Sequence, residues 1–124
     1  VEQSGPVGKR DYAILLLATR LGLRASDICR LEFDHLDWDH NVIAFIQYKT
    51  KKSIELPLLT DVGEAIVNYL RYGRPISGHS EIFLSARPPY RPMFRWGING
   101  VISRITNYIK KCGKRVIISE NGSY

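Results

Sequence analysis

Arg24 is the residue of this sequence best placed to carry chemistry, because it lies between two helix-like segments in the stretch Ala18–Leu31. Its guanidinium is planar and permanently charged, which suits it to binding an oxyanion. Three interpretations of the stretch remain open. Arg24 can be a surface charge between two helices. Residues 25–31 can enter a DNA groove as part of a helix-turn-helix motif. In the third interpretation, Arg24 is a catalytic arginine that the two helices hold in place.

A second group of cations lies in the polar segment that contains Lys49, Lys51 and Lys52. Lysine at a hairpin tip is usually a solvated charge on the edge of a sheet. Residues 87–124 are also basic, with eight Lys or Arg and one Glu, whereas residues 1–86 carry ten Lys or Arg and eleven Asp or Glu. The net charge of +6 therefore comes from the C-terminal part. Such a distribution is typical of a surface that binds a polyanion, although a solvated basic face is the alternative.

A helix pair must position Arg24. Tyr12 to Leu21 is apolar nearly all round and predicts a buried helix, which Gly22 ends as a left-handed cap. Ser26 is expected to cap a short second helix from Asp27 to Leu31. Arg24 would then lie in the turn between the two helices.

A β-hairpin must position the lysines. Residues 42–48 are β-branched and aromatic, and residues 53–58 alternate polar and apolar side chains, so both predict strands. Residues 49–52 form the tip between them. Residues 34–41 are polar and predict a turn, and the apolar run 81–84 is a possible third strand.

Two further helices complete the predicted α+β fold, which is mostly helical and forms a single domain over residues 1–124. The first begins at Thr60 or Asp61 and stops at Gly73. The proline-rich residues 85–93 form a loop before the second. The apolar face of that last helix contains Ile98, Val101, Ile102, Ile105, Tyr108, Ile109 and Cys112. Residues 113–124 are expected to be a loosely ordered tail.

The order of these features resembles the catalytic domain of the tyrosine recombinases, the phage integrase family. That domain opens with a buried helix, a "GLR" turn followed by Ser and an acidic residue, and a hairpin with "K-T-x-K" before "x-P-L". The matching residues here are Gly22-Leu23-Arg24, Ser26-Asp27, Lys49-Thr50-Lys51-Lys52 and Leu56-Pro57-Leu58. The lysine follows the arginine by 25 positions. The resemblance runs from about Gly8 to about Cys112.

The resemblance implies phosphoryl transfer on DNA through a 3′-phosphotyrosine intermediate, without a metal or other cofactor. It gives Arg24 the role of binding the scissile phosphate through paired hydrogen bonds. It gives Lys49 the role of general acid for the leaving 5′-oxygen, with Lys51 as the alternative. Asp27 is expected to orient Arg24 or its helix.

The sequence also departs from the family pattern. The family requires a His-x-x-Arg box, a later His or Trp, and a nucleophilic tyrosine. None of His35, His40 and His79 is followed by arginine three positions later. We therefore expect the chain to be the front part of a catalytic domain, truncated before the box, which binds DNA but is inactive alone. No tyrosine of this chain is assigned as the nucleophile.

The expected partner is double-stranded DNA, contacted by Lys51, Lys52, Arg87, Arg91 and Arg95. Trp96 can stack on a base or sugar, although a core position is favoured. By resemblance, the full-length protein works as a tetramer on DNA. We expect a cytoplasmic location, reduced cysteines at positions 29 and 112, no metal site, no membrane association and no small-molecule substrate. The alternative function is a non-catalytic helix-turn-helix regulator that reads bases with residues 25–31.

Overall fold

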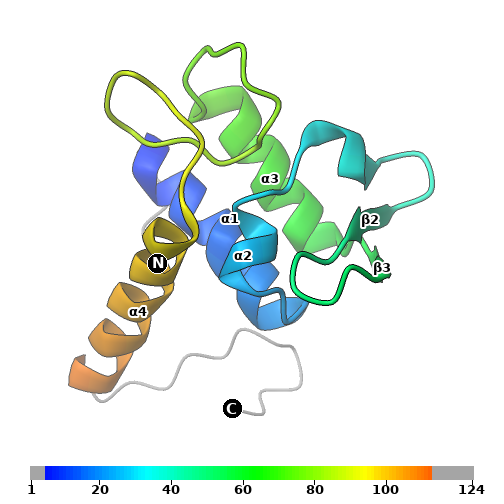
Figure 1. The fold of residues 1–124 in the computed structure, drawn as a ribbon. Helices are drawn as coiled ribbons and strands as arrows, with labels where there is room; N and C mark the ends of the chain where they lie inside the picture. Colours follow the sequence, from blue (N-terminus) through cyan, green and yellow to red (C-terminus); the bar gives the residue numbers. More distant parts are fainter. Residues whose placement is uncertain (1–4, 113–124) are drawn as a thin grey trace.

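The structure, a computed structural model, describes residues 5–112 of the chain. The predicted α+β class is confirmed, with mostly helical structure and one three-stranded antiparallel sheet (Figure 1). In chain order the elements are α1 (Pro6–Arg20), α2 (Ala25–Ile28), the 3₁₀ turn η1 (Phe33–His35), β1 (Leu36–Asp37), β2 (Val42–Ile46), β3 (Ser53–Pro57), α3 (Thr60–Tyr72) and α4 (Arg95–Cys112). The tail predicted at residues 113–124 lies outside the described residues.

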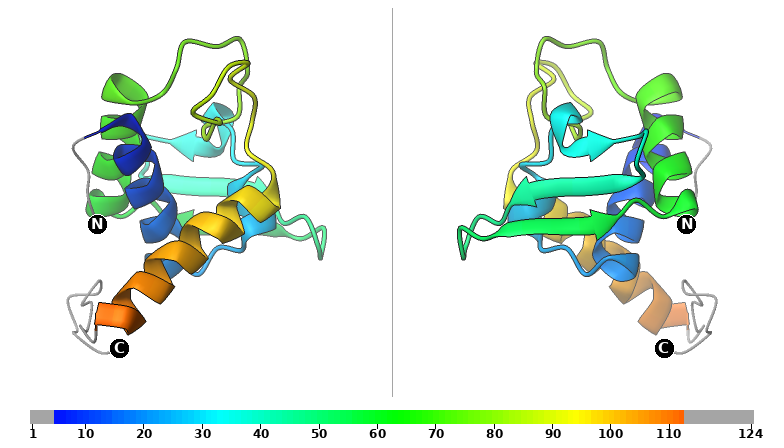
Figure 2. Two further views of the ribbon diagram at one scale, coloured as in Figure 1. Left: turned by 90° about the vertical axis from the view of Figure 1, so that its left-hand side faces the viewer. Right: turned by 90° about the vertical axis from the view of Figure 1, so that its right-hand side faces the viewer.

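Helix α1 forms the centre of the core, as its apolar sequence predicts. It begins at Pro6, earlier than the apolar run itself, because proline is well suited to the first turn of a helix. Residues Ala13 to Leu17 are all buried. Helix α1 packs most extensively on α3, while α4 crosses both α1 and α2 (Figure 2). The predicted cap is confirmed, since Gly22 has φ +68°, a conformation that a side chain would strain.

Helix α2 is shorter than predicted and begins earlier. It spans Ala25–Ile28, and Arg24 is its N-cap residue, with extended backbone at φ −82° and ψ 156°. The Arg24 carbonyl accepts hydrogen bonds from the backbone N–H groups of Asp27 and Ile28, at 2.9 and 3.0 Å. The prediction that Ser26 caps this helix was therefore wrong, because Ser26 is buried in the first turn. The start of α2 fixes the backbone of Arg24.

The predicted hairpin is confirmed by the antiparallel pairing of β2 with β3, in which Ile43 lies opposite Leu56 and Phe45 opposite Ile54. Ile43 and Phe45 are buried in the cluster that α1 and α3 also join. The third strand is not at residues 81–84, and that prediction was wrong. Strand β2 pairs with β3 on one side and with β1 on the other, and β1 lies in the segment predicted as a turn. Residues 81–84 instead form isolated bridges, from Glu81 to Glu32 and from Leu84 to Pro92.

The loop before α4 is held by Arg74, which donates hydrogen bonds to the backbone carbonyls of His79, Glu81 and Ile82 at 2.7 to 2.9 Å. Helix α4 then buries Ile98 and Val101 in the core. Tyr108 was predicted on the same apolar face, but it is 66% exposed. The reason is that the far half of α4 extends beyond the body of the fold (Figure 2). In the described part of the chain, no helix is long and apolar enough to cross a membrane.

Candidate active site

Arg24 is exposed at the N-terminus of α2, immediately after the turn at Gly22. The residue before Arg24 is anchored in the core. Leu23 is buried, and its backbone N–H donates a hydrogen bond to the Leu17 carbonyl at 3.2 Å. The guanidinium therefore extends into solvent from a backbone that the core holds, which suits a side chain that must bind an anion in a fixed place.

Lys49 is exposed in the loop that connects β2 to β3. Gln47 closes this loop, because its N–H donates to the Lys52 carbonyl at 2.8 Å and its carbonyl accepts from the Lys51 N–H at 2.9 Å. The Thr50 hydroxyl donates to the Gln47 side-chain oxygen at 2.7 Å. Lys51 has φ +60°, so the loop turns sharply there. These bonds give the hairpin tip one defined shape.

Asp27 connects the helix that carries Arg24 to the loop that carries Lys49. Its side chain is 3% exposed, and its Oδ1 atom accepts a hydrogen bond from the Tyr48 N–H at 3.1 Å. Its Oδ2 atom is buried and has no hydrogen-bond partner among the described residues. Asp27 was expected to orient Arg24 or its helix, which stays a prediction. The hydrogen bond that the structure shows for its carboxylate is with the backbone next to Lys49. The sequence-predicted residues thus belong to two elements joined by one carboxylate.

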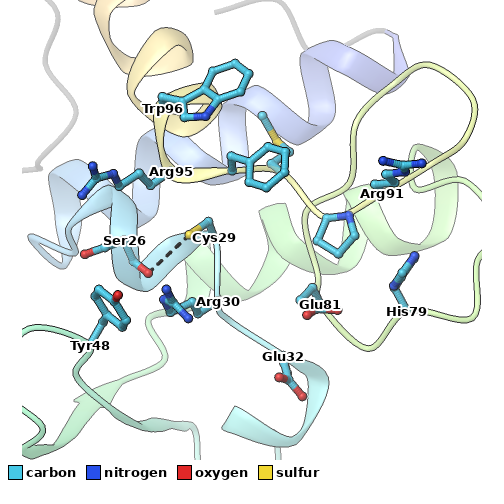
Figure 3. A pocket seen from close by; sticks show the side chains of 13 residues that line it. Ser26, Cys29, Arg30, Glu32, Tyr48, His79, Glu81, Arg91, Arg95 and Trp96 are labelled. Carbon is cyan, nitrogen blue, oxygen red and sulfur yellow. Dashed lines mark hydrogen bonds between the residues drawn. The ribbon is translucent and has the colours of Figure 1, made fainter.

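A groove of about 740 Å³ opens beside this junction (Figure 3). Its walls come from α2 with the residues just after it, from Tyr48 of the hairpin, from residues 79–81, and from the segment that leads into α4. Arg91 and Arg95, which were predicted to bind DNA, both line it. Arg87 lies in the preceding loop and is exposed. The groove therefore combines cations from the second and the last helical regions.

Trp96 lines the same groove and is 71% exposed, so the favoured prediction of a core position was wrong. Helix α4 turns Ile98 and Val101 to the core, which leaves Trp96 on a different side. Its ring stacks on that of Phe94, with centroids 5.6 Å apart and an interplanar angle of 15°. An exposed stacked pair of this kind offers an aromatic surface, and stacking on a base or sugar stays a prediction.

Cys29 also lines the groove, but its chemistry is that of a thiol. Burial raises the pKa of Cys29, against the smaller opposing effect of Arg30. Its Sγ atom donates to the Ser26 carbonyl at 3.4 Å. Cys29 is free, as predicted, while the side chain of Cys112 lies outside what the structure describes. Residues 5–112 bring together no group of three or more metal-binding side chains.

Sequence reasoning missed two residues at this junction, Arg30 and Tyr48. The Arg30 guanidinium carbon lies 3.7 Å from the centroid of the Tyr48 ring. The available signals were the position of Arg30, three residues after Asp27, and that of Tyr48, directly before Lys49. Neither signal identifies the contact, because it depends on how the hairpin packs against α2.

The comparison with protein families assigns the chain to the family that the order of Arg24, the hairpin and the following helices resembles. The sequence profile of the phage integrase family matches residues 1–114. The chain belongs to the phage integrase family. The predicted resemblance to tyrosine recombinases is thus confirmed.

Several curated proteins are similar to this chain over half of its length or more. Putative integrase/recombinase y4rA of Sinorhizobium fredii is 39% identical over 114 residues, covering 91% of this chain and 27% of the relative. Putative integrase/recombinase y4gC of the same species is 42% identical over 88 residues, covering 71% and 46%. Tyrosine recombinase XerC of Bacillus pumilus is 34% identical over 71 residues, covering 57% and 23%. The matched part of the chain thus spans less than half the length of each of these relatives.

Proposed function

We propose that the protein to which this chain belongs breaks and rejoins double-stranded DNA through a phosphotyrosine intermediate, with Arg24 and Lys49 as catalytic residues. The observation that carries the proposal is the junction of α2 and the hairpin. Arg24 is the N-cap residue of α2, Lys49 follows Tyr48 in the hairpin, and Asp27 binds the Tyr48 backbone at 3.1 Å. Two exposed cations thereby come from elements that are held in one relative position.

The reaction needs both cations for different reasons. A tyrosine hydroxyl loses its proton to water or a base, its oxygen attacks the phosphorus to form the new O–P bond, and the bond from phosphorus to the 5′-oxygen breaks. Arg24 donates two hydrogen bonds to the non-bridging oxygens, whose charge grows in the transition state. The Lys49 ammonium gives a proton to the leaving 5′-oxygen. The tyrosine would be supplied from outside these 124 residues.

Lys49 remains the preferred general acid over Lys51. The Lys51 ammonium lies 4.8 Å from the centroid of the Tyr48 ring, a contact that directs this side chain toward the hairpin itself. The left-handed backbone of Lys51 also gives that residue a role in shaping the loop. Lys51 is therefore better suited to bind DNA, together with Lys52, Arg87, Arg91 and Arg95.

The helix-turn-helix alternative is less well supported by the structure. Helix α2 has four residues, and three of them, Ser26, Asp27 and Ile28, are buried. A recognition helix must instead present several side chains to base edges in the major groove. The proposal therefore assigns the segment 25–31 to holding Arg24 and the hairpin.

The test uses the full-length protein and a pool of random-sequence duplexes in EDTA. DNA that becomes covalently attached to protein is recovered after denaturation, which identifies the cleaved site and the scissile phosphate. We expect a 3′-phosphotyrosine link and a free 5′-hydroxyl. Arg24→Ala should slow adduct formation by at least about 100-fold, the usual loss when one donor to a developing oxyanion is removed.

The matched control is Arg71→Ala, since Arg71 is an exposed arginine at the end of α3 that rests on Tyr72. It should react at the wild-type rate. The melting temperature of Arg24→Ala should equal that of the wild type, because the Arg24 side chain is exposed. An unfolded Arg24→Ala variant, or a folded one with unchanged adduct formation, contradicts the assignment of Arg24.

A further inference from the structure

Tyr48 is held from its backbone and from its ring. Its N–H donates to the buried Asp27 carboxylate at 3.1 Å, and its ring lies against the Arg30 guanidinium, 3.7 Å from centroid to guanidinium carbon. Lys51 approaches the same ring at 4.8 Å. Figure 3 shows Tyr48 and Arg30 side by side at one end of the groove. The residue before Lys49 is thus in contact with two residues of the α2 region and one of the loop.

The hairpin needs such an anchor because its tip lies outside the core. Phe45 is the last buried residue of β2, and Ile46 is 61% exposed. The loop bonds of Gln47 set the shape of the tip, but they join the hairpin only to itself. The contacts of Tyr48 with Asp27 and Arg30 connect the tip to α2, of which Arg24 is the N-cap residue, and to the turn that follows α2.

The two contacts differ in what they control. The Asp27 bond fixes one backbone atom and allows rotation about it. The Arg30–Tyr48 stack adds a second point of contact, several ångströms from the first, on a rigid ring. A guanidinium that lies over a ring also restricts the motion of both side chains. Two separated points set the orientation of the tip as well as its position.

We propose that Arg30 and Tyr48 form a positioning pair, which aims Lys49 at the leaving 5′-oxygen. This inference rests on the proposed function. Neither residue touches the reacting atoms. The proton still passes from the Lys49 ammonium to the 5′-oxygen as the bond from phosphorus to that oxygen breaks. The pair sets the distance and angle of this transfer.

The first measurement is the rate of adduct formation by variants of the full-length protein on the selected site. Tyr48→Leu, which keeps the backbone N–H, and Arg30→Met, which keeps the aliphatic stem, should each be about 10- to 100-fold slower. The double variant should be no slower than the slower single variant, because the two residues act as one unit. Tyr48→Phe retains the ring and should react within about twofold of the wild type. Tyr72→Leu, which removes the ring of the exposed Arg71–Tyr72 pair, is the matched control and should not change the rate.

The second measurement replaces the bridging 5′-oxygen of the scissile phosphate with sulfur. A thiolate leaves without taking up a proton, so the substrate no longer needs a general acid. Tyr48→Leu, Arg30→Met and Lys49→Ala should all react with this substrate at the wild-type rate. Arg24→Ala should stay slow, because its proposed role is at the non-bridging oxygens.

The outcomes separate the two proposals. If the wild type forms no adduct on either substrate, the proposed function fails and this inference fails with it. If the wild type reacts and Tyr48→Leu reacts equally fast on the oxygen substrate, the positioning pair alone is wrong. If Tyr48→Leu and Arg30→Met are slow on both substrates, they act in DNA binding or folding, which also overturns the pair. The positioning pair is supported if the sulfur substrate restores the rates of Tyr48→Leu and Arg30→Met, and if Tyr48→Phe keeps the wild-type rate on the oxygen substrate.

Discussion

Tyr69 is a tyrosine whose surroundings assign it to the core. Its side chain is 1% exposed, and its ring stacks on Phe83 with centroids 5.6 Å apart. The Leu84 N–H donates a hydrogen bond to its hydroxyl oxygen at 3.2 Å. Burial raises the pKa of the Tyr69 hydroxyl, with smaller opposing effects from the Leu84 bond and nearby arginines. A buried phenol that resists ionisation is suited to a structural role in the core.

The raised pKa of Tyr69 predicts a loss of stability at alkaline pH. Above about pH 10 the unfolded chain releases this proton while the folded chain keeps it, so the free energy of unfolding falls as pH rises. Tyr69→Phe should weaken this fall. Near pH 7 the variant should cost about 1 kcal/mol, because the Leu84 N–H loses its acceptor.

Urea unfolding of the two proteins between about pH 7 and pH 11 measures this effect, with Tyr72→Phe as the exposed control. The free-energy curves of wild type and Tyr69→Phe should converge as pH rises. Parallel curves over the whole range contradict a raised pKa at Tyr69.

At the scale of residues, the order of the motifs in the sequence predicted the candidate site. The sequence did not predict the contacts between side chains that connect its elements. Arg24 and Lys49 could be proposed from the sequence because a turn, a hairpin and their spacing are local features. The contact of Arg30 with Tyr48 was not found, since it depends on the tertiary packing of two elements. Trp96 was misplaced for a related reason. Its large apolar ring favours burial in general, and only the rotation of α4 shows that it is exposed.

At the scale of elements, a charged cluster ties α1 to α4. Asp11 accepts hydrogen bonds from Arg10 at 3.0 Å and from Arg104 at 3.3 Å. The Arg10 and Asp11 side chains are 10% and 13% exposed, while that of Arg104 is 66% exposed. Arg10 also donates to the Leu84 carbonyl at 3.2 Å. One carboxylate thus serves a nearly buried cation of its own helix and an exposed cation of α4.

This cluster predicts unequal effects from its two ion pairs. Asp11→Asn leaves the guanidinium of Arg10 nearly buried without its anion, so it should destabilise the fold by about 2 to 4 kcal/mol. Arg104→Ala removes only the exposed partner and should cost less than about 1 kcal/mol. Thermal and urea unfolding of the chain check both values. Equal costs would show that the link between α1 and α4, and not the burial of Arg10, is what stabilises the fold.

The elements that the sequence predicted are those with a complete local pattern. Helix α1 and the hairpin have continuous apolar or alternating residues and clear ends at Gly22 and at the lysine tip. Strand β1 was missed because two residues are too few to show alternation. Residues 81–84 were taken for a strand because they are apolar, but Ile82, Phe83 and Leu84 are buried by the surrounding loops and helices. Apolar runs report burial more directly than they report strand pairing.

At the scale of the whole molecule, the fold brings together cations that are far apart in the sequence. Arg30 and Tyr48 lie on one side of the groove, Arg91 lies in the segment that leads into α4, and Arg95 is the first residue of α4. The groove also has an acidic end, where Figure 3 shows Glu32 and Glu81 away from Arg95 and Trp96. A DNA backbone is therefore expected to approach at the end that Arg95 and Trp96 line.

This distribution predicts how DNA binding by the chain depends on salt. If Lys51, Lys52, Arg87, Arg91 and Arg95 each contact one phosphate, the logarithm of the association constant should fall with the logarithm of salt concentration at a slope of about −4 to −5. Arg91→Gln with Arg95→Gln should reduce this slope by about 2, equally for duplexes of unrelated sequence. Arg71 lines a different groove, so the control Arg71→Gln should leave the slope unchanged. Fluorescence anisotropy between about 50 and 200 mM salt gives the slopes. A slope near zero excludes backbone binding, whereas tight binding to one sequence alone supports the helix-turn-helix regulator, because base contacts carry sequence information that phosphate contacts lack.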